Sequence, residues 1–268
     1  MQSIVLTDHT GARAEILPEK GATVISYRSR GQEVFYRDQE NLDSPERPRC
    51  GVPFLFPVFG RTPEGSPYPM EIHGFGHTSS WQVLSREEAC LKLELRDSEQ
   101  TRAVYPFPFR VELTFALENG RLCIRQRYEN PGQEKMPFAF GFHPYFAAEE
   151  PEKARVDIHA AVEMDMGPGK AVPCTRESVS VSFPEGAPET GAFFAQASDC
   201  AVIHTERGAV KMAFDGNFNR LVLWAVRGKG FLCVEPINSS PNGLVTGDCF
   251  TLEPGGCREA EISFEVLK

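Results

Sequence analysis

The stretch Arg110–Tyr128 reads R-V-E-L-T-F-A-L-E-N-G-R-L-C-I-R-Q-R-Y. Apolar and polar residues alternate on both sides of Asn119-Gly120, which is typical of strands with one buried face. Asn-Gly between two alternating runs is the strongest short-range signal for a hairpin. The stretch therefore predicts two antiparallel strands joined by a tight turn.

The same alternation recurs along most of the sequence. Thr23–Tyr27 and Glu33–Tyr36 flank Gly31-Gln32, a pair suited to another hairpin turn. No segment of ten or more residues carries an apolar stripe at helical period. Many short strands separated by turn residues predict an all-β fold, a large antiparallel β-sandwich or barrel. No linker-like run interrupts them, so we expect one domain over residues 1–268. Further strands are expected at Leu91–Leu95, Ala154–Ile158, Val179–Phe183, Ala201–His204, Val210–Phe214, Leu221–Ala225, Phe231–Glu235 and Glu259–Val266.

Composition narrows the classes of function. The chain has 268 residues, a net charge of −9 and a pI near 5.3. A nucleic-acid partner would require a basic face, and an anionic membrane would require a block of Lys and Arg; neither is present. The N-terminus lacks a signal-peptide pattern, and no apolar run is long enough to span a bilayer. We therefore expect a cytoplasmic enzyme or binding protein, either a monomer or a homodimer.

The eight cysteines are widely spread and form no C-x-x-C pair. Several lie inside apolar strand patterns, as Cys123 does between Leu122 and Ile124, so they are expected to be small buried side chains in a reducing compartment. Zinc-ligand spacing is absent, and no metal site is expected.

The stretch Pro137–Phe146, P-F-A-F-G-F-H-P-Y-F, is almost entirely apolar and aromatic around His143. Pro144 restricts the residue before it to extended geometry and ends any regular ladder there. A strand that stops at this point would hold the imidazole rigidly at the rim of a pocket, as acid–base chemistry requires. A hydrogen-bonded structural histidine in an aromatic core is the competing interpretation.

A second unusual region, Arg49–Trp81, contains two arginines and two histidines among Gly, Pro and Phe. Arg49 and Arg61 bracket a run too apolar for a solvated loop, so each guanidinium requires either a core carboxylate or a ligand oxygen. His73 and His77 have the spacing of a helical metal pair, but Gly74 and Gly76 make a helix there unfavourable. We predict that these two arginines and two histidines bind a ligand without a metal.

Glu235 ends an apolar run, Phe231–Glu235, and Pro236 follows it. A carboxylate in that setting is partly desolvated, so its pKa is expected to rise towards a value useful to a general base. A surface glutamate at a strand end is the alternative. The sequence has no G-x-S-x-G elbow, no phosphate-binding P-loop and no dinucleotide-binding glycine motif. The candidate residues therefore predict a metal-free acid–base site that needs no cofactor.

Several motifs in a fixed order resemble the aldose 1-epimerase (galactose mutarotase-like) superfamily. They are G-V-P-F-L-F-P-V-F-G at 51–60, H-G-F at 73–75 with T-S-x-W at 78–81, G-F-H-P-Y-F at 141–146, V-E-P at 234–236 and L-E-P-G-G at 252–256. The resemblance covers the chain from about Gly21 onward. It implies a large β-sandwich of the galactose mutarotase-like type and the interconversion of α and β anomers of an aldose without a cofactor.

The resemblance also implies roles for individual residues. Glu235 matches the family's general base, which takes the proton from the anomeric O1 hydroxyl. His143 matches the general acid, which protonates the ring oxygen. His73 matches a second histidine that helps to bind and polarise the sugar.

The branch of the superfamily is less defined. The hexose-6-phosphate branch resembles this chain at Arg49, but His77 stands where that branch has its second phosphate-binding arginine, in H-G-F-G-H. This change favours a neutral aldose, because a bidentate cation is lost. Asp215 is a doubtful match to the aspartate that grips sugar hydroxyls in the galactose-specific branch.

Two other classes of function stay open. The first is a non-catalytic carbohydrate-binding or sensing protein on the same scaffold, since fold does not fix function. The second is a hydrolase or lyase, which requires a second carboxylate facing Glu235. Glu71 and Asp248 are the candidates for it.

Overall fold

The hairpin expected over residues 110–128 is present in the computed structural model. Strands β8 (Arg110–Glu118) and β9 (Arg121–Glu129) pair antiparallel, with Glu118 opposite Arg121. Asn119 and Gly120 have φ of 55° and 86°. Positive φ at both central residues is the geometry of a type I′ turn, whose twist matches that of the flanking strands.

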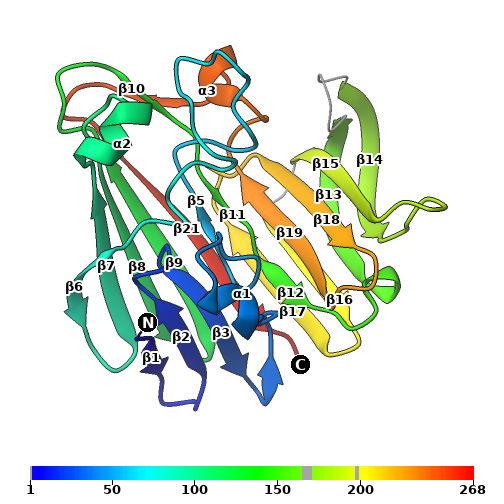
Figure 1. Cartoon of the computed structure of the whole chain (residues 1–268). Coiled ribbons are helices and arrows are strands. Elements are labelled where there is room, and N and C mark those ends of the chain that lie inside the picture. The colour runs from blue at the N-terminus through cyan, green and yellow to red at the C-terminus, as the bar shows by residue number, and fades with distance from the viewer. Residues whose placement is uncertain (1, 165–170, 197–198) are drawn as a thin grey trace.

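The structure describes residues 2–164, 171–196 and 199–268, and antiparallel strands dominate it (Figure 1). The remaining strands of the first half are β1 (Ile4–Thr7), β2 (Arg13–Leu17), β3 (Thr23–Ser29), β4 (Gln32–Glu33), β5 (Phe54–Leu55), β6 (Gln82–Arg86), β7 (Cys90–Arg96), β10 (Met136–Phe138), β11 (Gly141–Phe142) and β12 (Tyr145–Ala147). Those of the second half are β13 (Arg155–Met164), β14 (Ala171–Ser180), β15 (Glu189–Gln196), β16 (Cys200–Thr205), β17 (Gly208–Phe214), β18 (Arg220–Val226), β19 (Phe231–Ile237), β20 (Phe250–Leu252) and β21 (Cys257–Val266). The helices are short: α1 (Gln39–Asp43), α2 (Glu99–Val104), α3 (Gly243–Thr246) and the 3₁₀ turn η1 (Pro151–Lys153).

One large sheet organises the molecule. Its strand order is β5-β11-β19-β18-β15-β13-β16-β17-β21-β9-β8-β7-β6, with β12 also paired to β19 and β14 to β13. Strands β1 to β4 form a separate four-stranded sheet, and β10 pairs with β20. The expected all-β fold, a large antiparallel sandwich, is confirmed. Among the described residues, no helix has the length and apolar character needed to cross a bilayer.

The core is rich in aromatic rings that the sequence places at alternate positions. Phe138, Phe140 and Phe142 are all buried in the main apolar cluster, as expected from their spacing. Phe140 stacks on Tyr128 of β9, with ring centroids 4.6 Å apart. The segment that carries His143 is therefore anchored by large buried rings, which limits its movement.

Three strand predictions need correction. Strand β14 ends at Ser180, so most of the expected strand Val179–Phe183 is not a strand. Of the expected strand Glu33–Tyr36, only Glu33 lies in a strand, β4, although Phe35 forms a bridge with Phe146. Strand β19 continues past the expected end at Glu235 to Ile237, because Pro236 sits where the ladder to β18 tolerates it.

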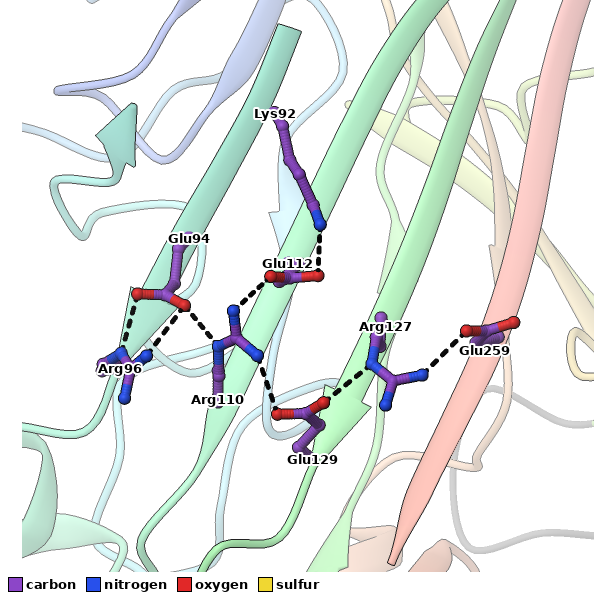
Figure 2. A network of polar contacts seen from close by, with 8 residues as sticks. All are labelled: Lys92, Glu94, Arg96, Arg110, Glu112, Arg127, Glu129 and Glu259. Carbon is purple, nitrogen blue, oxygen red and sulfur yellow. Dashed lines mark hydrogen bonds and ion pairs between the residues drawn. The ribbon is translucent and has the colours of Figure 1, made fainter. Parts of the chain in front are cut away.

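Charged residues form a continuous network across one face of β7, β8, β9 and β21 (Figure 2). Arg110 lies at its centre and pairs with Glu94, Glu112 and Glu129. The network extends to Lys92 and Arg96 at one side and to Arg127 and Glu259 at the other. These residues occupy the face of the strands that turns away from the apolar core.

Candidate active site

Strand register places His143 beside Glu235. On either side of His143, Gly141 lies opposite Ile237 and Tyr145 lies opposite Cys233 of β19. The same register puts His143 opposite Glu235, in the gap between β11 and β12 that Pro144 interrupts. The imidazole Nε2 is 3.3 Å from the carboxylate Oε1 of Glu235. Two groups that were predicted as acid and base are thus neighbours across one strand pair.

Ring contacts on three sides fix the His143 imidazole. It stacks on Tyr145 with centroids 4.7 Å apart and an interplanar angle of 12°. The rings of Trp224 and His73 meet it edge to face, at 5.9 Å and 5.6 Å. The His143 amide donates to the carbonyl of Pro53, so the backbone is fixed as well. Nδ1 is buried and has no hydrogen-bond partner among the described residues.

His73 is held by reciprocal hydrogen bonds to Gly60. The His73 amide donates to the Gly60 carbonyl (2.8 Å), and the Gly60 amide donates to Nδ1 of His73 (3.2 Å). Because Nδ1 accepts a hydrogen bond, the neutral ring carries its proton on Nε2. His73 also has a φ of 68°, which is unfavourable for a side chain of this size. The tertiary structure therefore holds an N–H donor in an unusual backbone conformation at the site.

Burial dominates the electrostatics of the site. It raises the pKa of Glu235 well above the ordinary glutamate value, and nearby Arg47 lowers it in part. It lowers the pKa of His143 to about 3, and Arg47 lowers it further. The pKa of His73 also lies well below its usual value, first through burial and then through His143. Burial therefore favours the neutral carboxyl of Glu235 beside the neutral imidazole of His143, and transfer of one proton from the carboxyl to the imidazole gives the ion pair without a change in net charge.

A cavity of about 330 Å³ opens over these groups. One wall is a face of the sheet, because Val222 and Trp224 of β18 lie on the same side as Glu235 of β19. Loops supply the opposite wall. The lining residues are Arg47, Arg49, Phe59, Gly60, Ile72, His73, His143, Tyr145, Glu189, Val222, Trp224, Glu235 and Pro241.

The predicted ligand-binding residues divide between the cavity and its surroundings. Arg49 and His73 line the cavity, as do Glu235 and His143. His77 is buried behind it, with its ring 6.4 Å from that of His73, and burial lowers its pKa to about 4. Arg61 is exposed and is absent from the lining, although it is close enough to lower the pKa of Arg47.

Several lining residues were not singled out by the sequence analysis, among them Arg47, Trp224 and Glu189. Arg47 lies between Pro45 and Pro48, and a basic residue bracketed by prolines was the signal available for it. Its guanidinium is half-buried and has no ion-pair partner among the described residues. Glu189 of β15 accepts a hydrogen bond from the indole N–H of Trp224 (3.1 Å), which orients a second carboxylate at the cavity.

The second carboxylates proposed for a hydrolase lie elsewhere. Both carboxylate oxygens of Asp248 accept from one guanidinium nitrogen of Arg220, Nη2 (2.8 and 2.9 Å), and Oδ2 also accepts from the Ser240 amide. Glu71 is exposed and outside the cavity lining. Asp215 bonds to Asn217 and to the Glu261 amide, also outside the lining. Among the described residues, no group of three or more His, Cys, Asp or Glu side chains is arranged to hold a metal ion.

Comparison with known proteins fixes the family. A sequence model described as aldose 1-epimerase matches residues 2–265. The chain belongs to the aldose 1-epimerase family. The resemblance inferred from the motifs is thereby confirmed.

Similar structures cover nearly the whole chain. The Slr1438 protein from Synechocystis sp. PCC 6803 is 30% identical, with a TM-score of 0.88 over 99% of this chain and 95% of that chain. A galactose mutarotase-like protein from Lactobacillus casei shares the fold at 18% identity, with a TM-score of 0.84 over 99% and 100% of the two chains. The uncharacterised protein YphB from Escherichia coli is 35% identical over 75 residues, a match that spans 28% of this chain and 24% of that protein.

Proposed function

We propose that this member of the aldose 1-epimerase family is an aldose mutarotase that interconverts the α and β anomers of a hexose. The observation that carries the proposal is the contact of 3.3 Å between Nε2 of His143 and Oε1 of Glu235 at the wall of a cavity large enough for a sugar. Mutarotation requires a base at the O1 hydroxyl and an acid at the ring oxygen, the two oxygens bonded to the anomeric carbon. Glu235 and His143 can supply the base and the acid.

In the proposed reaction, Glu235 as carboxylate removes the proton from the O1 hydroxyl while His143 as imidazolium protonates the ring oxygen. The C1–ring oxygen bond breaks, and the free aldehyde forms. Rotation about C1–C2 exposes the other face of the carbonyl, and the reverse proton transfers close the ring. Each cycle returns both protons to their original groups, so no cofactor or co-reactant is consumed.

The other lining residues have binding roles in this proposal. The Nε2–H of His73 donates to a sugar oxygen, because its Nδ1 is already occupied by the Gly60 amide. Arg47 and Arg49 donate to oxygens on the loop side of the cavity, and the Glu189 carboxylate accepts from a hydroxyl on the sheet side. The apolar rings between these groups exclude water and strengthen the polar contacts.

The test of these roles is anomer exchange followed by polarimetry or NMR. Glu235→Gln and His143→Ala are each expected to lower turnover about 10²–10⁴-fold, the range for one positioned proton-transfer group. Glu253→Gln, at an exposed ion pair, and His204→Ala, at a half-buried one, both outside the cavity lining, are the matched controls and should retain wild-type rates. Wild-type rates in either cavity variant would refute the assigned roles. Sugar binding without acceleration by the wild-type protein would favour a binding or sensing protein.

A phosphorylated hexose is the second candidate substrate. Arg47 joins Arg49 in the cavity wall and has no ion-pair partner among the described residues, so two cations face the cavity on one side. Freshly dissolved α-glucose, α-galactose and glucose 6-phosphate compared side by side distinguish the two substrate classes. Acceleration confined to glucose 6-phosphate would establish the phosphorylated sugar as the substrate. Acceleration of α-glucose or α-galactose would show that the reaction does not require a phosphate group.

A further inference from the structure

Lys20 has a buried ammonium group that binds backbone carbonyls rather than a carboxylate. Lys20 is 8% exposed, and its Nζ donates to the carbonyls of Asn41 (3.3 Å), Leu42 (3.0 Å) and Ser44. These carbonyls end helix α1, where a helix lacks intrahelical partners and carries partial negative charge. Burial lowers the pKa of Lys20, while Cys50, Asp43 and Glu46 oppose the shift. A buried ammonium of this kind fixes the end of α1 in place.

Asn41, inside the same short helix, binds the segment that follows it. Its Nδ2 donates to the carbonyl of Arg47 (3.2 Å), and its Oδ1 accepts from the amide of Arg49 (2.7 Å). We call residues Ser44–Arg49 the arginine segment. In extended chain, residues two apart point to the same side, and the side chains of Arg47 and Arg49 both line the cavity. One amide side chain therefore holds both arginines through their backbone.

The turn that carries Lys20 also supports the histidine loop. The Gly21 amide donates to the carbonyl of Ser79 (2.9 Å), and the Trp81 amide donates to the carbonyl of Pro18 (3.0 Å). Gly21 packs directly on the backbone of His77, where a Cβ would lie 2.2 Å from the carbonyl carbon. The same turn thus contacts Ser44, at the start of the arginine segment, and residues 77–81, which follow His73 in the chain.

We propose that Lys20 and Asn41 are positioning residues, which hold Arg47 and Arg49 at the cavity through the end of α1. The expected effect on kinetics rests on the proposed function. The claim that Lys20 and Asn41 hold the arginine segment in place does not depend on that function. Arg47 acts electrostatically on Glu235 and on the three histidines His73, His77 and His143. Displacement of the arginine segment therefore changes both substrate binding and the protonation of the acid–base pair.

The variants for the test are Lys20→Met, which keeps the length of the side chain and removes the ammonium, and Asn41→Leu, which keeps its size and removes both hydrogen bonds. Lys20→Arg restores a cation and is the conservative rescue. Lys153→Met, at an exposed ion pair with Glu150, is the matched control. Asn41→Leu keeps the inference testable if Lys20→Met fails to fold.

Amide hydrogen exchange provides a readout that does not depend on catalysis. We expect exchange across the arginine segment to accelerate at least about tenfold in Lys20→Met and Asn41→Leu, with the Arg49 amide affected most, since an amide loses protection when its acceptor moves. Lys153→Met should leave it unchanged. If the arginine segment is protected equally in the wild type and in both positioning variants, the inference is overturned. This outcome decides the matter whether or not the wild-type protein accelerates anomer exchange.

Kinetics of the same variants test the functional part. We expect KM to rise roughly tenfold with kcat changed less than about threefold, the pattern for lost uniform binding. We also expect the pH–rate profile to move to higher pH, because an electrostatic contribution of Arg47 is lost. Lys20→Arg should recover much of both effects. An unchanged KM and pH profile in a variant whose arginine segment exchanges faster would overturn the claim that this segment positions the arginines for the reaction. A wild-type protein without activity would refute the proposed function alone.

Discussion

Burial and one neighbouring cation set the chemistry of Glu235. The carboxyl is 3% exposed, and burial raises its pKa, while Arg47 lowers it. The same arginine lowers the pKa of His143, whose imidazolium it repels. Arg47 therefore shifts the proposed base and the proposed acid in the same direction, so that a change at this residue moves both titrations together.

This coupling predicts the effect of Arg47→Gln on the pH profile. Loss of the cation destabilises the Glu235 carboxylate and stabilises the His143 imidazolium, so the pKa of each group rises. The two limbs of the bell in kcat/KM report the two pKa values of the coupled pair, and both values rise, so the whole bell should move to higher pH. Arg102→Gln on α2 is the control, and its profile should overlay the wild type. Movement of only one limb, or movement to lower pH, would contradict the proposed assignment.

At the scale of elements, alternation predicted the strands that have one apolar face towards the core and one polar face away from it. β8 and β9 are of this kind, and so is β7. β6 is exposed along its whole length and β14 nearly so, and such strands have no apolar period for a sequence to reveal. The His143-Pro144 break and the run before Glu235 were visible for a different reason, because each is an ionisable residue at the end of a continuous apolar stretch that is buried throughout. Arg47 could not be found in this way, because it lies in a loop segment whose backbone is held by hydrogen bonds with the Asn41 side chain and has no periodic pattern.

The turn beneath the two cavity loops gives a prediction about an element. Gly21 has a φ of 69°, and a Cβ there would lie 2.2 Å from the His77 backbone. Gly21→Ala should lower the free energy of unfolding by about 3 kcal/mol, through backbone strain and a clash that cannot relax. Gly11→Ala is the matched control, since its φ is 82° and no atom lies within 4 Å of the added methyl. It should cost only the strain, about 1 kcal/mol. Equal losses in urea unfolding would show that the contact with His77 is unimportant.

At the scale of the whole molecule, the sheet that supplies one wall of the cavity continues to strands whose outer face carries ion pairs. β19 and β18 carry Glu235 and Trp224, and the same sheet runs through β21 to β9, β8 and β7. Apolar residues from Leu6 to Val266 share one core cluster between these parts. The strands of the cavity wall and the strands that carry the ion pairs of Figure 2 therefore belong to one sheet and one core.

Removal of Arg110 tests how much this ion-pair network stabilises the fold. Hydrogen bonds from Arg96 and then Arg110 lower the pKa of Glu94; at Glu129, burial raises the pKa, but hydrogen bonds from Arg127 and Arg110 outweigh it. A depressed folded-state pKa contributes stability above the unfolded value, and this stability is lost as pH falls through the folded pKa.

Arg110→Met should therefore lower the free energy of unfolding by about 2 kcal/mol at pH 7, the scale of charge-assisted hydrogen bonds to groups that keep other partners. The difference from wild type should begin to shrink as pH falls below the unfolded glutamate pKa of about 4.3, and it should vanish only once pH has fallen through the depressed folded-state pKa values of both carboxyls. Arg207→Met, at an exposed pair with Glu149, should change stability by less than about 0.5 kcal/mol at any pH. Urea unfolding of the three proteins from pH 3 to pH 8 measures this directly. A loss that stays constant across that range would mean that Arg110 acts through packing of its side-chain stem rather than through its charge.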